Sequence, residues 1–164
     1  DVKICGYIHE QGKPSVIVMN KWDLVEKDTN TINKYNTKLK EDLKFMDYMV
    51  PIYVSAKTGL RTDKILDIAN RVLDNANRRV STGQLNDLIL DCVRASEPPS
   101  VNGKRLKIKY ATQISVAPPN FVLFVNEASL MHFFFFLYLE NCIRKTFDFE
   151  GTPIKIVARE KDDE

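Results

Sequence analysis

The stretch from Val16 to Asp23, VIVMNKWD, places three chemically useful side chains directly after an apolar run. The apolar run favours a buried strand, and the polar residues follow at its carboxyl end, where open α/β sheets bind their ligands. A carboxylate there accepts two parallel hydrogen bonds from the N1 and N2 edge of guanine, whereas adenine offers no such pair of donors. We therefore expect Asp23 to select guanine, Asn20 to brace the loop and the Lys21 stem to cover the ring. The alternative is that these are ordinary turn residues.

A second polar cluster, Ser55, Ala56 and Lys57, follows the short apolar run 51–54. In a guanine site the backbone N–H of Ala56 would donate to the base O6, which rejects adenine because adenine carries an amino group at that position. Lys57 would cover the ring face opposite Lys21, and Ser55 would hold the loop. A plain strand-to-helix turn with a capping hydroxyl is the alternative. Because Ser55 follows Asp23 by 32 positions with a helical pattern between, the pair of motifs favours the guanine site.

Composition is that of an ordinary globular chain. Its 164 residues suffice for one domain or two small ones, and a net charge of +2 does not by itself demand a nucleic acid partner. Three cysteines without a C-x-x-C pair, and only two histidines, argue against a disulfide framework or a metal site. No Ser/His/Asp set or pair of carboxylates can be assembled from the pattern, so we predict no catalytic residue.

No targeting or membrane segment is expected. The chain opens without the charged and apolar regions of a signal peptide. The run 130–139, LMHFFFFLYL, has about half the length needed to span a bilayer, so we interpret it as a buried helix with His132 packed inside it. We therefore expect a cytoplasmic location and no membrane partner.

The order of elements predicts two domains. Residues 1–79 alternate helix and strand as α-β-α-β-α, which is half of a doubly wound parallel sheet. Residues 80–164 change to α-β-β-α-β. The elements expected in this second part are helices at 82–95 and 129–147, the latter ended by Gly151, and strands at 104–114, 120–125 and 153–159.

The predicted strand 104–114, KRLKIKYATQI, alternates apolar and basic residues. One face carries Leu106, Ile108 and Tyr110. The other carries Arg105, Lys107 and Lys109. A basic strand face can contact phosphates or a partner, and a solvated outer face of the sheet is the alternative.

Several segments resemble the bacterial GTPase family Der, also called EngA. They are NKWDLVEKD, SAKTGLRTDKIL, STGQLNDLILDCV, RLKIKYATQISVAPPNFVLFVN and FEGTPIKIVARE. The resemblance implies an incomplete doubly wound P-loop GTPase domain of the α/β class in residues 1–79, followed by an α+β KH-like domain in residues 80–164. It also implies GTP or GDP as ligand and a role in large ribosomal subunit assembly. Asn20, Lys21 and Asp23 match the fourth GTPase motif, and Ser55, Ala56 and Lys57 match the fifth.

The chain also departs from a complete GTPase. It has no G-x-x-x-x-G-K-[ST], so Mg²⁺ and hydrolysis are expected only through a missing part of a longer parent. Residues 80–164 contain no G-x-x-G, the loop with which KH modules clamp RNA. We therefore expect docking against ribosomal RNA and protein or other domains of the parent, and no DNA partner. The run FFFF at 133–136 differs from the polar residues usual in the family.

Two alternatives fit parts of this pattern. One is an Era-like GTPase, whose KH domain binds ribosomal RNA directly, although the absent G-x-x-G argues against it. The other is a non-catalytic ribosome-interaction scaffold that lacks a phosphate-binding half. Upstream sequence separates the three hypotheses, because two P-loops indicate Der, one indicates an Era-like protein and none indicates a scaffold.

Overall fold

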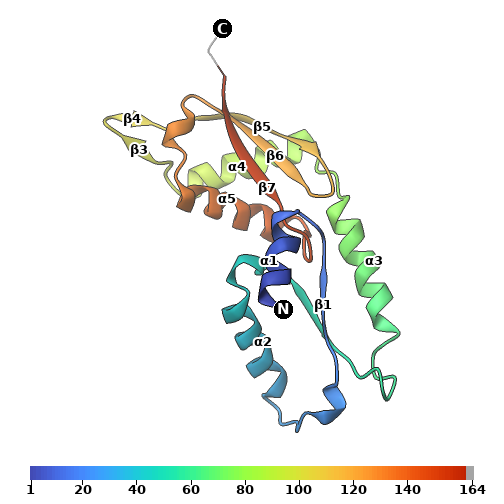
Figure 1. Ribbon diagram of the computed structural model, residues 1–164. Helices are drawn as coiled ribbons and strands as arrows, with labels where there is room; N and C mark the ends of the chain where they lie inside the picture. The colour runs from blue at the N-terminus through green and yellow to red at the C-terminus, as the bar shows by residue number, and fades with distance from the viewer. Residues whose placement is uncertain (162–164) are drawn as a thin grey trace. The chain divides into compact units, whose positions relative to one another are not determined.

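The computed structural model describes residues 1–161, which divide into two compact units (Figure 1). Unit 1 consists of residues 1–76 together with 149–153. Unit 2 consists of residues 77–148 and the remainder from 154. Among the described residues, no helix has both the length and the apolar character needed to cross a bilayer.

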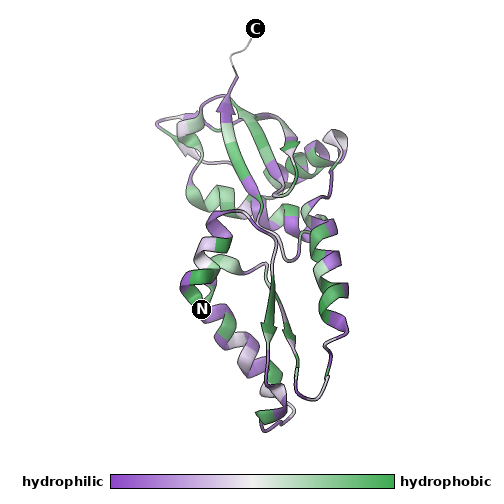
Figure 2. Cartoon of the chain, turned by 45° about the vertical axis from the view of Figure 1, so that its right-hand side comes forward, coloured by the Kyte–Doolittle hydropathy of each residue, from purple (hydrophilic) through white to green (hydrophobic). Residues whose placement is uncertain are grey.

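Unit 1 alternates helices and strands, as the sequence predicts. Its elements are α1 (Val2–Glu10), β1 (Val16–Met19), η1 (Trp22–Leu24), α2 (Thr31–Asp42), η2 (Lys44–Met46), β2 (Val50–Tyr53) and α3 (Lys64–Ala76). Strands β1 and β2 pair in parallel, with Val16 opposite Val50 and Met19 opposite Tyr53. Helices α2 and α3 flank this hydrophobic pair of strands (Figure 2). The parallel register brings the carboxyl ends of both strands to the same edge of the sheet.

A hydrophobic cluster forms the core of unit 1. Its buried members are Leu43, Met46, Tyr48 and Met49, and Cys5, Ile8, Ile17 and Leu39 pack against them. The strand at residue 16 was expected to be fully buried, and this is wrong for one face. Ile17 packs into the core, whereas Val18 is exposed, because consecutive strand residues point to opposite faces.

A short segment far along the chain, residues 149–153, belongs to unit 1. The Gly151 N–H donates to the Tyr48 carbonyl at 2.7 Å, and the Ser15 N–H donates to the Gly151 carbonyl at 2.8 Å. The Asn75 side chain donates to the Glu150 carbonyl at 3.0 Å. Gly151 was expected to end a helix, but that helix ends at Thr146. Glycine is required at 151 because φ is +82° and a Cβ would lie 2.3 Å from a Val72 methyl carbon.

Unit 2 follows the predicted order α-β-β-α-β, with a small additional hairpin. Its elements are α4 (Thr82–Ala95), β3 (Ser100–Val101), β4 (Lys104–Arg105), β5 (Ile108–Ser115), β6 (Asn120–Val125), η3 (Ala128–Leu130), α5 (Phe133–Thr146) and β7 (Lys155–Glu160). The three-stranded sheet has the order β5-β6-β7, with β5 antiparallel and β7 parallel to β6. Helices α4 and α5 contact each other, and α4 contacts β5.

The core of unit 2 lies between these helices and one face of the sheet. The helices contribute Leu85, Ile89, Cys92, Leu139 and Ile143, and the sheet contributes Ala111, Phe121, Leu123 and Val125. Helix α4 is capped by Ser81, whose hydroxyl accepts from the Gln84 N–H at 3.2 Å. Asn86 of α4 also bonds the Ala111 backbone of β5 twice, accepting from its N–H and donating to its carbonyl, each at 2.8 Å. This side chain therefore satisfies β5 backbone groups that no strand pairs.

The predicted single strand 104–114 is divided, and its alternation changes phase. Residues 104–105 pair in the β3–β4 hairpin, and β5 begins only at Ile108. A register shift follows between Ile108 and Tyr110, so Ala111 takes a core position and Tyr110 lies on the outer face. There Tyr110 stacks on Phe124 with ring centroids 4.4 Å apart. The prediction that Tyr110 shares one strand face with Leu106 and Ile108 is therefore wrong.

The aromatic helix is buried on one face only. It begins at Phe133 after the η3 turn rather than at residue 129. Phe135 is buried, whereas Phe133 and Phe134 are 72% and 79% exposed. His132, expected to be packed, is exposed at the N-cap position of α5. Four consecutive phenylalanines cannot all face a core, because successive helical residues point in different directions.

Candidate functional site

The two predicted loops of unit 1 meet at the carboxyl edge of the β1–β2 sheet. Their backbones are tied by two hydrogen bonds: Val54 N–H donates to the Met19 carbonyl at 2.9 Å, and Trp22 N–H donates to the Val54 carbonyl at 2.9 Å. The loop after β1 is therefore held directly beside the start of the loop after β2.

Asn20 links the two loops through its side chain. Its Oδ1 accepts from the Lys21 N–H at 2.8 Å and from the Ala56 N–H at 3.0 Å. Lys21 has φ of 62°, in the left-handed region where residues other than glycine are uncommon. The hydrogen bond from the Lys21 N–H to Asn20 Oδ1 supports this conformation. Asn20 therefore braces the loop, and it occupies the Ala56 N–H that the sequence assigned to a base oxygen.

Asp23 and Ser55 form the second link. The Ser55 hydroxyl donates to Asp23 Oδ1 at 2.6 Å and accepts from the Thr58 N–H at 3.2 Å. Ser55 is fully buried and Asp23 is half-buried. The hydrogen bond from Ser55 lowers the pKa of Asp23 below its ordinary value of 3.8, and the nearby Lys57 ammonium lowers it further. Asp23 is consequently ionised at neutral pH, and it offers hydrogen-bond acceptors only.

The remaining predicted residues lie at the rim of this cluster. Lys21 and Lys57 belong to the two loops, one to each, and both are exposed. Ala56 is exposed next to Lys57. The loops thus place a carboxylate, an amide and two long cationic side chains around one loop junction. Both lysine side chains are exposed, and it stays a prediction that their stems cover the two faces of one ring.

An aromatic cluster beneath the loops was not foreseen from the sequence. Trp22 is buried, with its ring centroid 4.5 Å from that of Tyr53 and 5.2 Å from that of Tyr35. The Tyr53 hydroxyl donates to Asn36 Oδ1 at 2.6 Å. Trp22 thus packs between Tyr53 of β2 and Tyr35 of α2, and this packing holds the loop of residues 20–23 in place. The available signal was the position of Trp22 between two polar motif residues, where a solvated turn would not need a large apolar side chain.

The basic residues predicted in unit 2 do not share one strand face. Arg105 lies in β4, Lys107 lies between the strands and Lys109 lies in β5. They nevertheless border two adjoining hollows of about 550 and 230 Å³, which share Val93 and Ile108. We call this surface between α4 and the β4–β5 segment the α4–β5 groove. Arg105 also forms an ion pair with Glu97, a lining residue of the same groove.

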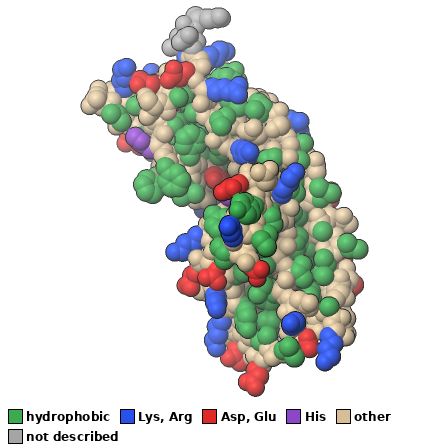
Figure 3. Space-filling view, viewed as in Figure 1, with side chains coloured by type: hydrophobic (Ala, Val, Ile, Leu, Met, Phe, Trp, Pro, Cys, Tyr) green, Lys and Arg blue, Asp and Glu red, His purple; other side chains and the backbone are tan. Residues whose placement is uncertain are grey.

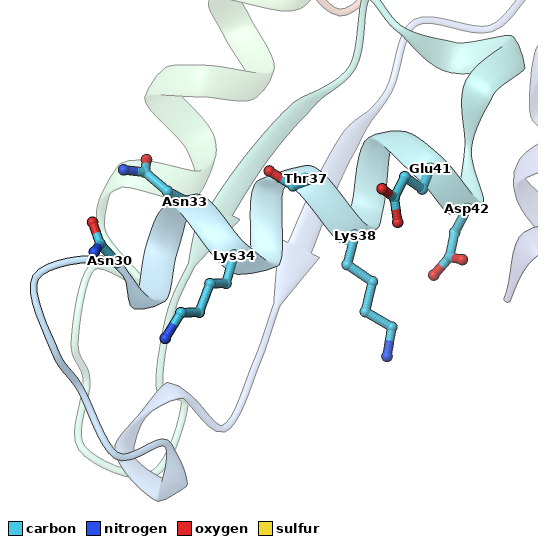
Figure 4. A pocket seen from close by; sticks show the side chains of 7 residues that line it. All are labelled: Asn30, Asn33, Lys34, Thr37, Lys38, Glu41 and Asp42. Carbon is cyan, nitrogen blue, oxygen red and sulfur yellow. The ribbon is translucent and has the colours of Figure 1, made fainter.

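The other hollows and side-chain clusters of the described residues do not form a candidate binding or catalytic site. A hollow of about 650 Å³ lies along α2, but all seven lining side chains come from that helix and its cap (Figure 4). Within residues 1–161, no group of His, Cys, Asp or Glu is arranged to hold a metal ion. The three cysteines are free thiols, and burial together with the neighbouring Cys142 raises the pKa of Cys92 to about 12. Cys92 is therefore a protonated core residue.

Comparison with known proteins gives two consistent likenesses. Residues 79–159 match a family described as the KH-domain-like, C-terminal domain of the EngA bacterial GTPase enzymes. The whole chain is 54% identical over 164 residues to the GTPase Der of Acetivibrio thermocellus. It is 50% identical over 163 residues, 99% of its length, to the GTPase Der of Halalkalibacterium halodurans. In both cases the chain covers 37% of the relative's length.

These likenesses confirm the resemblance on which the sequence-based expectation rested. Each Der relative aligns with essentially the whole chain, and the KH-domain-like match covers most of the second unit. The chain therefore belongs to the family of the bacterial GTPase Der, also named EngA, and residues 79–159 are its KH-domain-like domain.

Proposed function

We propose that this chain supplies guanine recognition to a Der-type GTPase and that its KH-like domain docks the enzyme on the assembling large ribosomal subunit. The observation that carries the first part is the junction of the two loops, in which Ser55 bonds Asp23 and Ala56 bonds Asn20. Residues 1–79 then act as the latter half of a P-loop GTPase domain and 80–164 as the docking domain. The proposed location is cytoplasmic.

Each loop residue has a distinct role toward the base. An ionised Asp23 accepts from guanine N1–H and N2–H, a pair of donors that adenine does not offer. Asn20 yields the Ala56 N–H to the base O6 when nucleotide binds. The exposed stems of Lys21 and Lys57 lie against the two ring faces and keep their ammonium groups in water. GTP and GDP are therefore the proposed ligands.

The chain by itself is proposed to recognise the base without hydrolysing the nucleotide. Its sequence has no phosphate-binding G-x-x-x-x-G-K-[ST] loop, which holds the phosphates and the Mg²⁺ ligand in this class of enzyme. Phosphate contacts contribute much of the affinity at such sites. We therefore expect weak guanine nucleotide binding, and Mg²⁺ enters only through the remainder of the parent enzyme.

Nuclear magnetic resonance titration tests base recognition at millimolar nucleotide. GDP should shift the backbone amide signals of Asn20, Asp23 and Ala56, whereas ADP should leave them in place. Asp23→Asn should weaken GDP about ten- to a hundredfold and favour xanthosine diphosphate, whose altered edge suits an amide. The matched control is Asp28→Asn, which removes a nearby loop carboxylate outside the site. Equal responses to GDP and ADP would contradict the proposal.

The docking function is proposed for the α4–β5 groove. Arg105, Lys107 and Lys109 border this groove, and cationic side chains along a hollow suit the phosphates of ribosomal RNA. The Der family membership favours this over the Era-like alternative and over a non-catalytic scaffold. Ribosomal protein or another domain of the parent enzyme is the competing occupant.

Charge reversal tests docking. Replacing Arg105, Lys107 and Lys109 by glutamate should reduce co-sedimentation with large ribosomal subunits and flatten its dependence on salt, because each lost phosphate contact removes counterion release. The control reverses Lys34 and Lys38 of α2, which lie on unit 1. If the groove variant sediments as the unchanged protein does, the groove is not the docking surface.

A further inference from the structure

The outer face of the β5–β6–β7 sheet combines aromatic rings with positively charged side chains. The register of the strands places Tyr110 beside Phe124, and Phe124 beside Arg159. Tyr110, Ile114 and Val157 are 36%, 47% and 39% exposed although all are large apolar side chains. Core helices α4 and α5 take the opposite face of this sheet. The outer face therefore exposes large apolar side chains on both edge strands of the three-stranded sheet.

Tyr110 and Phe124 form a stacked aromatic pair on this face, with their ring centroids 4.4 Å apart. Tyr110 and Phe124 stack with an interplanar angle of 19°. The Lys161 ammonium lies 5.1 Å from the Tyr110 ring centroid, so the π face of Tyr110 already receives a cation. Lys161 is a long flexible side chain, and an incoming base can replace it on the ring.

The charge on this face has one sign. Alternation along the strands directs Tyr110, Thr112 and Ile114 of β5, Phe124 of β6, and Lys155, Val157 and Arg159 of β7 outward, whereas Val122 at the centre of the sheet is fully buried. Within residues 1–161, no aspartate or glutamate occupies these positions, and Lys155, Arg159 and Lys161 form no ion pair. Figure 3 shows Lys and Arg side chains among hydrophobic ones in the part of unit 2 that contains β7 and β5, with Asp and Glu side chains near its upper end.

We propose that this outer sheet face binds unpaired nucleotides of single-stranded RNA, with Tyr110 and Phe124 stacking on bases and Lys155, Arg159 and Lys161 contacting phosphates. Base stacking on sheet aromatics beside a cationic track is a general mode of single-strand recognition that needs no G-x-x-G loop. The surface is separate from the α4–β5 groove, although Tyr110 borders both. The choice of RNA over other polyanions rests on the proposed ribosomal function.

Fluorescence anisotropy of a labelled oligouridine with the 164-residue chain tests the proposal. Phe124→Leu is the discriminating variant, because it removes one ring, keeps an apolar side chain and lies outside the groove. It should weaken binding about tenfold. Tyr110→Leu should act in the same direction, whereas Tyr110→Phe should bind as the unchanged chain does. Amide spectra of each variant establish that unit 2 remains folded.

Charge and aromatic controls complete the experiment. The double variant Lys155→Gln, Arg159→Gln should reduce the slope of log K against log salt by about 1.4, at about 0.7 per single-strand phosphate contact. Phe133→Leu on α5 removes a ring that is more exposed, at 72%, and lies outside the face, and it should leave binding unchanged.

Three outcomes would overturn the assignment. They are no binding of oligouridine, unchanged binding by Phe124→Leu, and equal weakening by Phe133→Leu. Unchanged binding by Phe124→Leu leaves a protein as the occupant of this face. Loss of oligouridine binding only in the Arg105, Lys107, Lys109 variant would instead assign RNA to the groove. Failure on the sheet face alone therefore leaves the guanine and docking proposals standing.

Discussion

In unit 1 the candidate site consists of two loops tied together by side chains of the motifs themselves, whereas the surfaces of unit 2 depend on contacts that no motif names. Asn20 and Asp23 each bond a residue of the second loop directly. In unit 2 the outer face depends on a register shift that moves Tyr110 outward. It also depends on Asn86, whose side chain hydrogen-bonds the backbone N–H and carbonyl of Ala111 in β5. A loop junction built from local motif residues can be predicted from sequence, whereas a surface built from tertiary geometry cannot.

The largest expected effect tests whether the fold of unit 1 depends on the distant segment 149–153 as well as on its own residues 1–76. Gly151→Ala forces a Cβ to within 2.3 Å of a methyl carbon of the buried Val72 and places alanine at φ of +82°. We expect the free energy of unfolding of unit 1 to fall by about 2–4 kcal/mol. Urea denaturation followed by the fluorescence of Trp22, the single tryptophan, measures this.

Gly83→Ala is the matched control for that change. A Cβ at Gly83 meets nothing within 4 Å and the position lies inside α4, so we expect stability to stay or rise by about 0.5–1 kcal/mol. If Gly151→Ala unfolds at the same urea concentration as the unchanged chain, the segment 149–153 is not needed for unit 1. Unit 1 would then depend only on contacts within residues 1–76, and its contrast with unit 2, which depends on contacts between distant segments, would become sharper.

The sequence predicted the order of elements in both units because hydrophobic periodicity and turn residues are local signals. It also predicted which residues form the loop junction, since parallel neighbouring strands must end at the same edge. It did not predict the aromatic support of Trp22, Tyr35 and Tyr53, because that contact joins three separate elements. The place of residues 149–153 in unit 1 was equally invisible, because only packing against Val72 and Tyr48 shows it.

Errors in unit 2 have one shared cause. Alternation along residues 104–114 assumes an unbroken strand, so a single register shift moves every later side chain to the opposite face. Tyr110 was misplaced for this reason, and Arg105, Lys107 and Lys109 lost their common face. The four phenylalanines were misjudged because composition indicated burial while helical geometry allows only part of them to reach the core.

The second prediction concerns Asn86, the side chain on which the β5 backbone depends. Asn86→Ala leaves the Ala111 N–H and carbonyl without the partners they have at 2.8 Å. We expect a loss of about 2 kcal/mol from the stability of unit 2, since unpaired polar groups in a part-buried position are costly. Hydrogen exchange at the Ala111 amide should accelerate, while Trp22 fluorescence should report an unchanged unit 1.

Asn33→Ala on α2 serves as the control for Asn86. Asn33 is an exposed helical residue of unit 1, and its replacement should leave the Ala111 amide protected. If the Ala111 amide stays protected from hydrogen exchange in Asn86→Ala, the β5 strand is stable without the hydrogen bonds from α4. The outer face would then be a property of the strands alone, and the contrast with unit 1 would weaken.

The smallest expected effect is a pH response confined to the loop junction of unit 1. Because Ser55 lowers the pKa of Asp23 below 3.8, the Asp23–Ser55 link stabilises the folded loops above that pH. It is lost as the pH falls through the lowered value, when the carboxylate is protonated. Carboxyl titration by nuclear magnetic resonance should therefore place Asp23 below 3.8, and Ser55→Ala should move it upward toward 3.8.

Asp28 makes this measurement specific. Its pKa is also lowered, first by the Asn30 backbone N–H and then by Lys34 and Thr31, none of which involves Ser55. Ser55→Ala should leave the Asp28 titration in place while the Asp23 titration moves. A common shift of both carboxyl groups would mean that Ser55 acts by holding the fold of the whole loop region. In that case the fold of unit 1 as a whole joins the two loops. The motif residues would then not form by themselves the loop junction on which the proposed guanine recognition depends.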